Sequence, residues 1–172
     1  MDFLELAEKR YSVRSFSGQK VEKEKLDKIL RAAQIAPTAC NYQPQKVLVL
    51  QSEEALEKWS KCSPCSYGAT LVILVCADKN LTWKRPFDGK DSADVDGSIV
   101  LTHIMMEAAE LGIGSTWIMF FDPAKAKEEF NLPENYEAVG ALVMGYPAED
   151  ATPADKHSDK KPLEETTFFE TL

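Results

Sequence analysis

The feature that most constrains the fold of this chain is an uninterrupted apolar run at residues 71–77, with the sequence Leu-Val-Ile-Leu-Val-Cys-Ala. A strand with one face in water alternates apolar and polar residues, whereas a continuous run suits a strand covered on both faces. Residues 93–111 form a second long stretch, apolar on most faces of a helix, which suits a core or a subunit interface. Together they favour a sheet packed between helices.

The rest of the chain supplies elements for such layers. Turn residues delimit them: Pro37 and Gly112 each end a helix, and Asp2 and Asp122 are suitable N-caps. Helical or extended patterns predict helices over 2–9, 21–36, 53–61 and 123–130, an extended segment at 13–17, and strands over 46–51, 115–121 and 138–144. The polar segment 80–91 contains Pro86 and Gly89, which favours a mobile loop.

Length and charge limit the class of protein. The 172 residues fit one domain, and a chain of this size buries roughly 70% of its unfolded surface. The net charge of −8 makes nucleic acid an unfavourable partner. No apolar run reaches the ~18 residues that cross a bilayer, and the acidic N-terminus lacks a signal-peptide layout. We therefore expect a cytoplasmic protein without a membrane partner.

The four cysteines, at positions 40, 62, 65 and 76, are expected to be free thiols in a reducing compartment. Cys62 and Cys65 form a C-x-x-C, which is compatible with a redox dithiol or with half of a metal site. The surrounding Pro64 and Gly68 indicate a loop, and the sequence offers no second C-x-x-C and no nearby histidine. We expect ordinary thiols and no metal.

A basic cluster stands out against the acidic background in Arg10-Tyr11-Ser12-Val13-Arg14. If the chain is extended here, Arg10, Ser12 and Arg14 point to one side at intervals of ~6.5–7 Å. Guanidinium groups match phosphate oxygens, so the pattern is compatible with a phosphate site. The alternative is that both arginines pair with surface carboxylates.

A second candidate is the segment 36–44, where a helix halts and small or amide-bearing residues follow. Asn41 and Gln43 each offer a donor and an acceptor, which suits the uracil-like edge of a flavin. Thr38 and Ala39 are small enough for the backbone to approach a flat ligand. An ordinary polar turn is the alternative.

Other motifs point away from side-chain catalysis. Gly112 and Gly114 lie between a helix and a strand, the reverse of a dinucleotide-binding loop. His103 is expected to be packed in the core, and the basic segment 157–161 is compatible with a solvated patch. The sequence shows no Ser/His/Asp set, paired carboxylates or metal cluster, so a bound cofactor would carry the chemistry.

Taken in order, five segments resemble the FMN-dependent nitroreductase family over residues 2–165. They are Arg10-Tyr11-Ser12-Val13-Arg14-Ser15-Phe16, Ala36-Pro37-Thr38-Ala39-Cys40-Asn41-Tyr42-Gln43-Pro44, residues 108–118, Gly145-Tyr146-Pro147 and Lys160-Lys161-Pro162-Leu163-Glu164-Glu165. The resemblance implies an α+β protein, a three-layer α/β/α sandwich with a mostly antiparallel sheet. It also implies a homodimer formed through the long helices, with FMN at the interface.

The resemblance also assigns roles to residues. Arg10, Ser12 and Arg14 would hold the FMN phosphate with help from Lys160, or from Lys161 in its place, and Tyr11 would add backbone contacts. Pro37, Thr38 and Ala39 would cross from the partner subunit to line the flavin, which Asn41 and Gln43 would also face. Ile118 and Met119 would lie beside the ring, with the Met119 backbone N–H as the donor to flavin N5.

The implied reaction is ping-pong, from NADH or NADPH through FMN to a small acceptor of the aromatic, nitro or quinone type. The alternatives are a carrier that binds FMN without turnover, dehalogenation or flavin breakdown on the same fold, and a thiol redox protein using Cys62 and Cys65.

Segment 80–91 is the only obvious lid. Its Trp83 and Phe87 either stack on substrate or, as we prefer, anchor the loop. The aromatic tail 162–172 is expected to dock on the partner.

Overall fold

A four-stranded sheet forms the middle of the molecule. The structure, a computed structural model, describes residues 2–171, so Met1 and Leu172 lie outside it. The strand order is β1–β2–β4–β3, and every neighbouring pair is antiparallel, in line with the mostly antiparallel sheet that the family resemblance implies. The strands are β1 Gln45–Leu50, β2 Leu71–Asp78, β3 Gly114–Ile118 and β4 Tyr136–Gly145.

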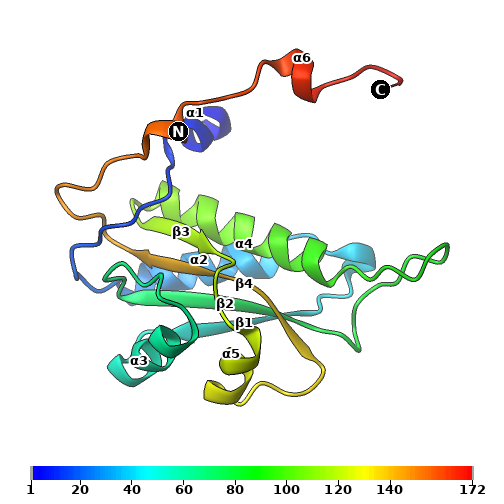
Figure 1. The fold of residues 1–172 in the computed structure, drawn as a ribbon, viewed down its shortest axis with the longest axis horizontal. Coiled ribbons are helices and arrows are strands. Elements are labelled where there is room, and N and C mark those ends of the chain that lie inside the picture. The colour runs from blue at the N-terminus through cyan, green and yellow to red at the C-terminus, as the bar shows by residue number, and fades with distance from the viewer. Residues whose placement is uncertain (1, 172) are drawn as a thin grey trace.

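Helices cover both faces of this sheet, which completes the three layers (Figure 1). On one face lie α2 (Lys23–Ile35) and α4 (Ala93–Glu110), and on the other lie α3 (Glu53–Cys62) and α5 (Pro123–Glu129). Short α1 (Phe3–Lys9) and α6 (Leu163–Thr166) lie outside the layers, with single 3₁₀ turns at Ala39–Asn41 and Asp155–His157. The expected α/β/α sandwich is confirmed.

Strand β2 shows why the apolar run requires two covering layers. Its residues point alternately to opposite faces. Ile73 and Val75 pack with α2 and α4, whereas Val72 and Leu74 pack against Trp59 of α3. All four strand residues are at most 1% exposed. Each such burial stabilises the fold by about 1.5–3 kcal/mol.

The expected helix boundaries follow from local chemistry. Asp2 and Asp122 accept backbone N–H bonds at the starts of α1 and α5. Pro37 follows directly after α2 and its extended cap residue, and Gly112 adopts a positive φ of 74° just beyond α4. These residue types end helices for steric and hydrogen-bonding reasons.

Three expectations need correction. Strand β3 ends at Ile118 and not at Phe121, because the chain turns where the Phe121 N–H donates to the Met119 carbonyl. His103 is not a core residue: it lies on the outward face of α4, half-buried, and its Nδ1 is 2.9 Å from the Ile99 carbonyl. Segment 80–91 is the third case.

Segment 80–91 is a hydrogen-bonded hairpin and not an irregular loop. The backbones of Lys84 and Asp91 form an isolated antiparallel β-bridge, and the Ser92 N–H donates to the Trp83 carbonyl at 2.9 Å. Alternating charged residues around Pro86 concealed this pairing in the sequence. Phe87 at its tip is 95% exposed, so the prediction that Phe87 anchors the segment is wrong. Trp83 is half-buried.

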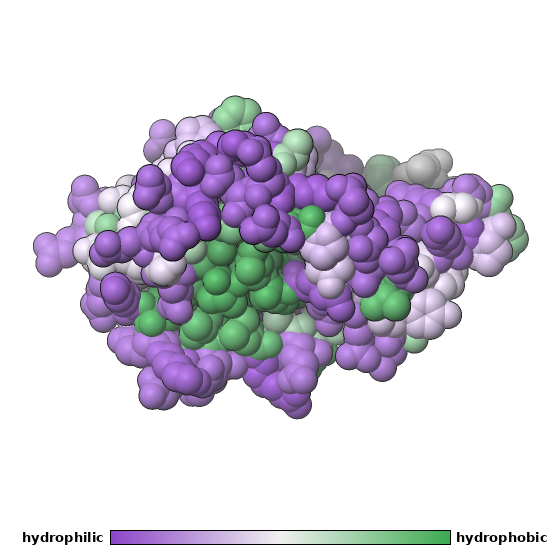
Figure 2. Space-filling model, turned by 90° about the horizontal axis from the view of Figure 1, so that it is seen from below, coloured by the Kyte–Doolittle hydropathy of each residue, from purple (hydrophilic) through white to green (hydrophobic). Residues whose placement is uncertain are grey.

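The face that carries α3 and α5 is less completely covered than the opposite one. Figure 2, which looks at the molecule from below, shows an apolar patch framed by polar residues on this face. The two covering helices have only ten and seven residues. Among residues 2–171, no helix is long and apolar enough to cross a membrane.

Candidate functional site

The N-terminal basic cluster lies along the free edge of the sheet. The Val13 N–H donates to the Ser115 carbonyl at 3.0 Å, and the buried Thr116 hydroxyl donates to the Val13 carbonyl. These bonds align the segment with β3, and the Val13 side chain is buried. Because side chains alternate in extended chain, Ser12 and Arg14 face away from the core together. This is the arrangement that the sequence predicts for these two residues.

Arg14 remains available for a ligand. Its guanidinium is exposed, with Nη1 3.4 Å from the Ser12 carbonyl. Within residues 2–171 neither Arg10 nor Arg14 forms a salt bridge, so the alternative reading of surface ion pairs does not describe them. Tyr67 lies close to Arg14. A hydrogen bond with Cys65 raises the pKa of Tyr67, and Arg14 opposes that rise.

Arg10 occupies a neighbouring position. It is the C-cap of α1 and lines a cavity of about 250 Å³ between α1 and the C-terminal end of α4, together with Tyr11 and Gly112. Ser12 and Arg14 do not line this cavity, so convergence of all three side chains on one phosphate stays a prediction.

Lys160 comes to the same end of the molecule from the far end of the sequence. The Tyr11 hydroxyl donates to the Ala151 carbonyl at 3.1 Å, and His157 Nε2 lies 3.2 Å from the Glu8 carbonyl. The rings of Tyr11 and His157 meet edge to face. The Lys160 ammonium donates to the His157 carbonyl and is exposed. The structure therefore places Lys160 near α1, and its phosphate role stays a prediction.

The end of β3 presents exposed apolar side chains. The Ile118 side chain is buried in the core, so only its backbone is left for a ligand. Met119 and Phe120 are exposed, and the Ser63 hydroxyl donates to the Phe120 carbonyl at 2.7 Å. That bond ties the loop after α3 to the end of β3. The proposed contact of the Met119 N–H with a flavin stays a prediction.

The second predicted segment winds tightly after Pro37, and residues 38–43 are here named the coil. Cys40, Asn41 and Gln43 have φ values of 51°, 54° and 52°. Left-handed backbone costs non-glycine residues roughly 1–2 kcal/mol each, and such strain gathers at functional sites. The Thr38 hydroxyl helps to hold the coil by accepting from the Gln43 N–H at 3.0 Å. The Asn41 and Gln43 side chains are exposed.

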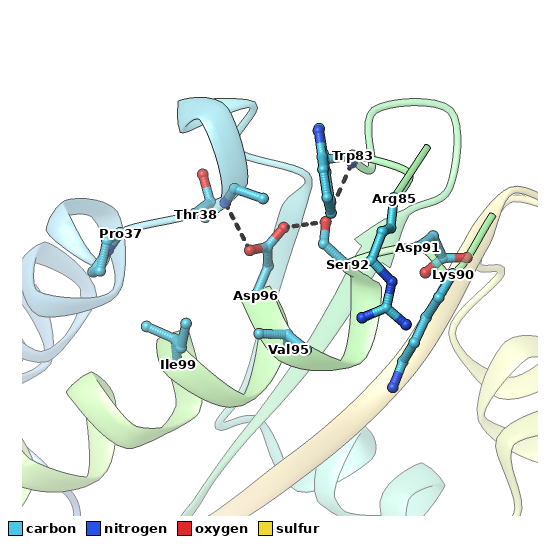
Figure 3. Close-up of a pocket in the computed structure, with 11 residues that line it drawn as sticks. Pro37, Thr38, Trp83, Arg85, Lys90, Asp91, Ser92, Val95, Asp96 and Ile99 are labelled. Atoms are coloured by element: carbon cyan, nitrogen blue, oxygen red, sulfur yellow. Dashed lines mark hydrogen bonds between the residues drawn. The ribbon is translucent and has the colours of Figure 1, made fainter. Parts of the chain in front are cut away.

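Asp96 fixes this coil to α4, and sequence reasoning missed it. It is 1% exposed, and its two carboxylate oxygens accept from the Ala39 N–H at 2.9 Å and from the Ser92 hydroxyl at 2.7 Å (Figure 3). A carboxylate on the buried face of a largely apolar helix was the available signal, because buried charges need partners. Asp96 is therefore a positioning residue for the coil.

The coil, α4 and the hairpin enclose a cavity of about 440 Å³ (Figure 3). Thr38 and Ala39 border it on one side, and the hairpin residue Trp83 borders it on the other. Val95 and Ile99 of α4 form its apolar floor. A cavity with apolar walls and a few polar groups is the usual form of a small-molecule site.

Within one chain the two predicted halves of the site lie far apart. The coil adjoins Asp96, and Arg10 adjoins Ala109, thirteen residues further along α4. At 1.5 Å per residue this separation is about 20 Å. The cationic half suits a phosphate, and the half with small residues and amides suits a flat heterocycle. The residues thus fit FMN in kind, but one chain does not bring them together.

The cysteines form a further group of chemically reactive side chains. All four cysteines are free, and burial, assisted by Glu129, raises the pKa of Cys62. A raised pKa disfavours the thiolate that dithiol chemistry needs. Among the described residues no group of His, Cys, Asp and Glu side chains is arranged to hold a metal.

Known proteins resemble this chain over most of its length. The sequence profile of the Nitroreductase family matches residues 7–66 and 60–146. A putative NADH dehydrogenase/NAD(P)H nitroreductase of Archaeoglobus fulgidus is 34% identical over 148 residues, which cover 82% of this chain and 83% of that protein.

Solved structures show the same likeness. A nitroreductase family protein from Clostridium difficile superposes with a TM-score of 0.95 at 48% identity, covering 100% of both chains. An FMN-dependent nitroreductase from Clostridium difficile has a TM-score of 0.79 at 29% identity and covers 99% of this chain and 100% of its own. This chain belongs to the nitroreductase family.

Proposed function

We propose that the protein is an FMN-dependent oxidoreductase that takes electrons from NADH or NADPH and passes them to a small acceptor, and that it works as a homodimer. The acceptor class that suits the cavity is a flat aromatic, nitro or quinone compound. The observation that carries the proposal is the placement of the two site halves at opposite ends of α4.

The dimer follows from that placement. A two-fold axis near the middle of α4 would pair this helix antiparallel with its copy, bringing the coil of one subunit to the Arg10 end of the other. The outward face of α4 has the composition of an interface. Val95, which is 53% exposed, lines a shallow depression of about 610 Å³ together with Ile99 and His103.

The C-terminal tail supports the same assembly. Residues 158–171 are all exposed and extend away from the body of the chain (Figure 1). Phe168 and Phe169 are 54% and 87% exposed, and apolar rings so placed are stabilised by docking. We propose that residues 162–172 dock on the partner subunit; Leu172, the last of them, lies outside the described residues.

Each group of residues then has a task. Arg10, Ser12 and Arg14, with Lys160, hold the phosphate, and the backbone near Tyr11 adds contacts. Met119 and the backbone of Ile118 form one wall. From the partner subunit come the residues that cover the ring: Pro37, Thr38, Ala39, Asn41 and Gln43.

The chain's own contribution is binding and orientation. Bound FMN supplies hydride acceptance from the nicotinamide and hydride or electron delivery to the acceptor. The cationic residues fix one end of the cofactor, and the Asp96-anchored coil fixes the other. The apolar cavity floor at Val95 and Ile99 excludes water from the place where substrates would lie.

The test is the visible absorption spectrum of the purified protein, before and after anaerobic addition of NADH or NADPH. We expect a flavin spectrum that bleaches and returns when an acceptor such as menadione is added. A flavin that neither nicotinamide bleaches would instead favour an FMN carrier. Failure to bind added FMN would exclude both roles.

A further inference from the structure

The hairpin between β2 and α4 carries a charged face toward the 440 Å³ cavity. Its two arms are held together by the Arg85 N–H, which donates to the Lys90 carbonyl at 2.9 Å. Arg85 and Lys90 therefore lie opposite each other, and both line the cavity beside Trp83 (Figure 3). Two cations and an indole thus border one cavity from a single hairpin.

Both cations keep unused binding capacity. Asp88 engages Nε and Nη2 of Arg85 at 2.7 and 2.5 Å, which fixes the guanidinium plane. Nη1 makes no hydrogen bond within residues 2–171, and a guanidinium has five donors in all. The Lys90 ammonium forms no salt bridge in the same part of the chain.

The two carboxylates that line the cavity already have hydrogen-bonding partners within the chain. Asp91 pairs with Lys79 at 2.5 Å, and this pairing lowers the pKa of Asp91. Asp96 accepts from the Ala39 N–H and the Ser92 hydroxyl. Of the two cations that line the cavity, Arg85 is paired with Asp88, whereas Lys90 has no carboxylate partner within residues 2–171.

The remaining walls suit a ring. Figure 3 shows the indole of Trp83 standing at the rim, with Val95 and Ile99 below. Aromatic and branched side chains recognise flat ligands by contact area, and a cation pair recognises an oxyanion by charge-assisted hydrogen bonds. Neither recognition requires a reaction to occur.

We propose that Arg85 and Lys90 form an anion subsite that makes this cavity selective for a flat ring bearing a carboxylate or a phosphate. The assignment of that ring as a substrate rests on the proposed function, but the binding preference does not. Two sources carry this chemistry: an acidic aromatic acceptor, and the phosphate groups of NADPH.

The experiment compares holo-protein with the double variant Arg85→Gln/Lys90→Gln. Lys84→Gln is the matched control, because Lys84 lies on the same hairpin and does not line the cavity. The probes are 4-nitrobenzoate and its neutral counterpart 4-nitrobenzamide. Binding is read from Trp fluorescence and from the flavin absorbance, with Trp83→Phe identifying the responding indole.

We expect the double variant to raise the Kd of 4-nitrobenzoate about tenfold, the effect of losing one charge-assisted contact, and to change that of 4-nitrobenzamide less than about twofold. The control should leave both unchanged. Equal effects on the two probes, or none, would overturn the anion subsite. This binding result stands whether or not NADPH reduces the flavin, so it is separable from failure of the proposed function.

Steady-state kinetics then distinguish the sources. If the anion is a phosphate of NADPH, the double variant raises the KM for NADPH more than that for NADH. If it belongs to the acceptor, the KM for 4-nitrobenzoate rises and the preference between nicotinamides stays as in the parent. Either result supports the subsite, and unchanged KM values for all three ligands contradict it.

Discussion

At the scale of single residues, Asp96 shows how one buried carboxylate organises a site. It joins a strained coil to the first turns of α4 through the Ala39 N–H and the Ser92 hydroxyl. Left-handed backbone at Cys40 and Asn41 persists only where neighbouring contacts over-determine it. The position of Thr38 and Ala39 therefore depends on a buried carboxylate of another element.

We predict that Asp96→Ala lowers the free energy of unfolding by about 1–3 kcal/mol, because it leaves a buried N–H and a buried hydroxyl without an acceptor. FMN affinity should fall as well, since the coil is released. Urea unfolding and FMN titration measure the two effects. Asp94→Ala, an exposed carboxylate in the same helical turn, is the control and should change neither. An unaltered FMN affinity in Asp96→Ala would refute the positioning role.

Lys79 gives a pH-dependent prediction. It pairs with Asp91 and Glu137. Hydrogen bonds to Asp91 and then Glu137 raise the pKa of Lys79, and the hydrogen bond from Lys79 lowers the pKa of Asp91. A lowered carboxyl pKa contributes stability above its unfolded value of about 3.9, which is lost as the pH falls through the folded pKa. A raised lysine pKa contributes stability below about 10.4, which is lost as the pH rises through the folded pKa.

Lys79→Met should therefore be less stable than the parent by a constant amount between about pH 5 and pH 9, with the difference shrinking below about pH 4. Urea unfolding at a series of pH values measures this. Lys28→Met removes a lysine that has no salt bridge in the described chain. Its difference in unfolding free energy from the parent should not change with pH. The same flat profile in Lys79→Met would contradict the pairing argument.

At the scale of elements, α4 packs closely against β4, and α4 also provides the apolar floor of the cavity. A Cβ added at Gly97 would lie 2.7–2.9 Å from the Cγ1, Cγ2 and Cβ atoms of Val139. Real Cβ contacts are longer, and rotation of Val139 cannot move its own Cβ. The glycine thus allows α4 to lie close to the sheet, where Asp96 and Val100 are buried.

We predict that Gly97→Ala lowers the free energy of unfolding by about 1–3 kcal/mol through overpacking, despite the higher helix propensity of alanine. In the Val139→Ala background, Gly97→Ala should lower the free energy of unfolding by less than it does in the parent protein. Chemical unfolding of the four proteins in the cycle gives the coupling. Strict additivity of the two substitutions would show that the close approach does not matter.

At the scale of the whole molecule, the site is a property of two chains. In our proposal Arg14 comes from one subunit and Ala39 from the other, and two-fold symmetry gives two such sites in each dimer. If the FMN-bound protein has the molecular mass of a monomer in solution, this arrangement is wrong. Removal of residues 162–172 should weaken the dimer if the tail docks as proposed.

Subunit mixing tests the shared site directly. Arg14→Ala and Ala39→Trp should each abolish FMN binding in their own homodimers. After the two are unfolded and refolded together, half of the dimers are mixed, and each mixed dimer has one intact site. We therefore expect about one quarter of the parental FMN content. No recovery, with mixed dimers demonstrated by mass spectrometry, would place Arg14 and Ala39 in the same chain's site.

The sequence by itself determined the layered fold and the ends of most elements. The apolar run of β2 requires cover on both faces, and Pro37, Gly112 and Asp122 act on their immediate neighbours, so local chemistry is sufficient. Ser12 and Arg14 were likewise predictable, because alternation in extended chain depends on spacing alone. The family likeness rested on motifs of the same local kind.

Only the tertiary structure decided the rest, because it depends on contacts between residues distant in sequence. The hairpin at 80–91 forms through cross-strand hydrogen bonds that its charged, proline-containing sequence does not signal. Asp96 acquires its role from Ala39, 57 residues away. The separation of Arg10 from the coil along α4 is equally a matter of packing, and it is what makes a second copy of the chain necessary to our proposed site.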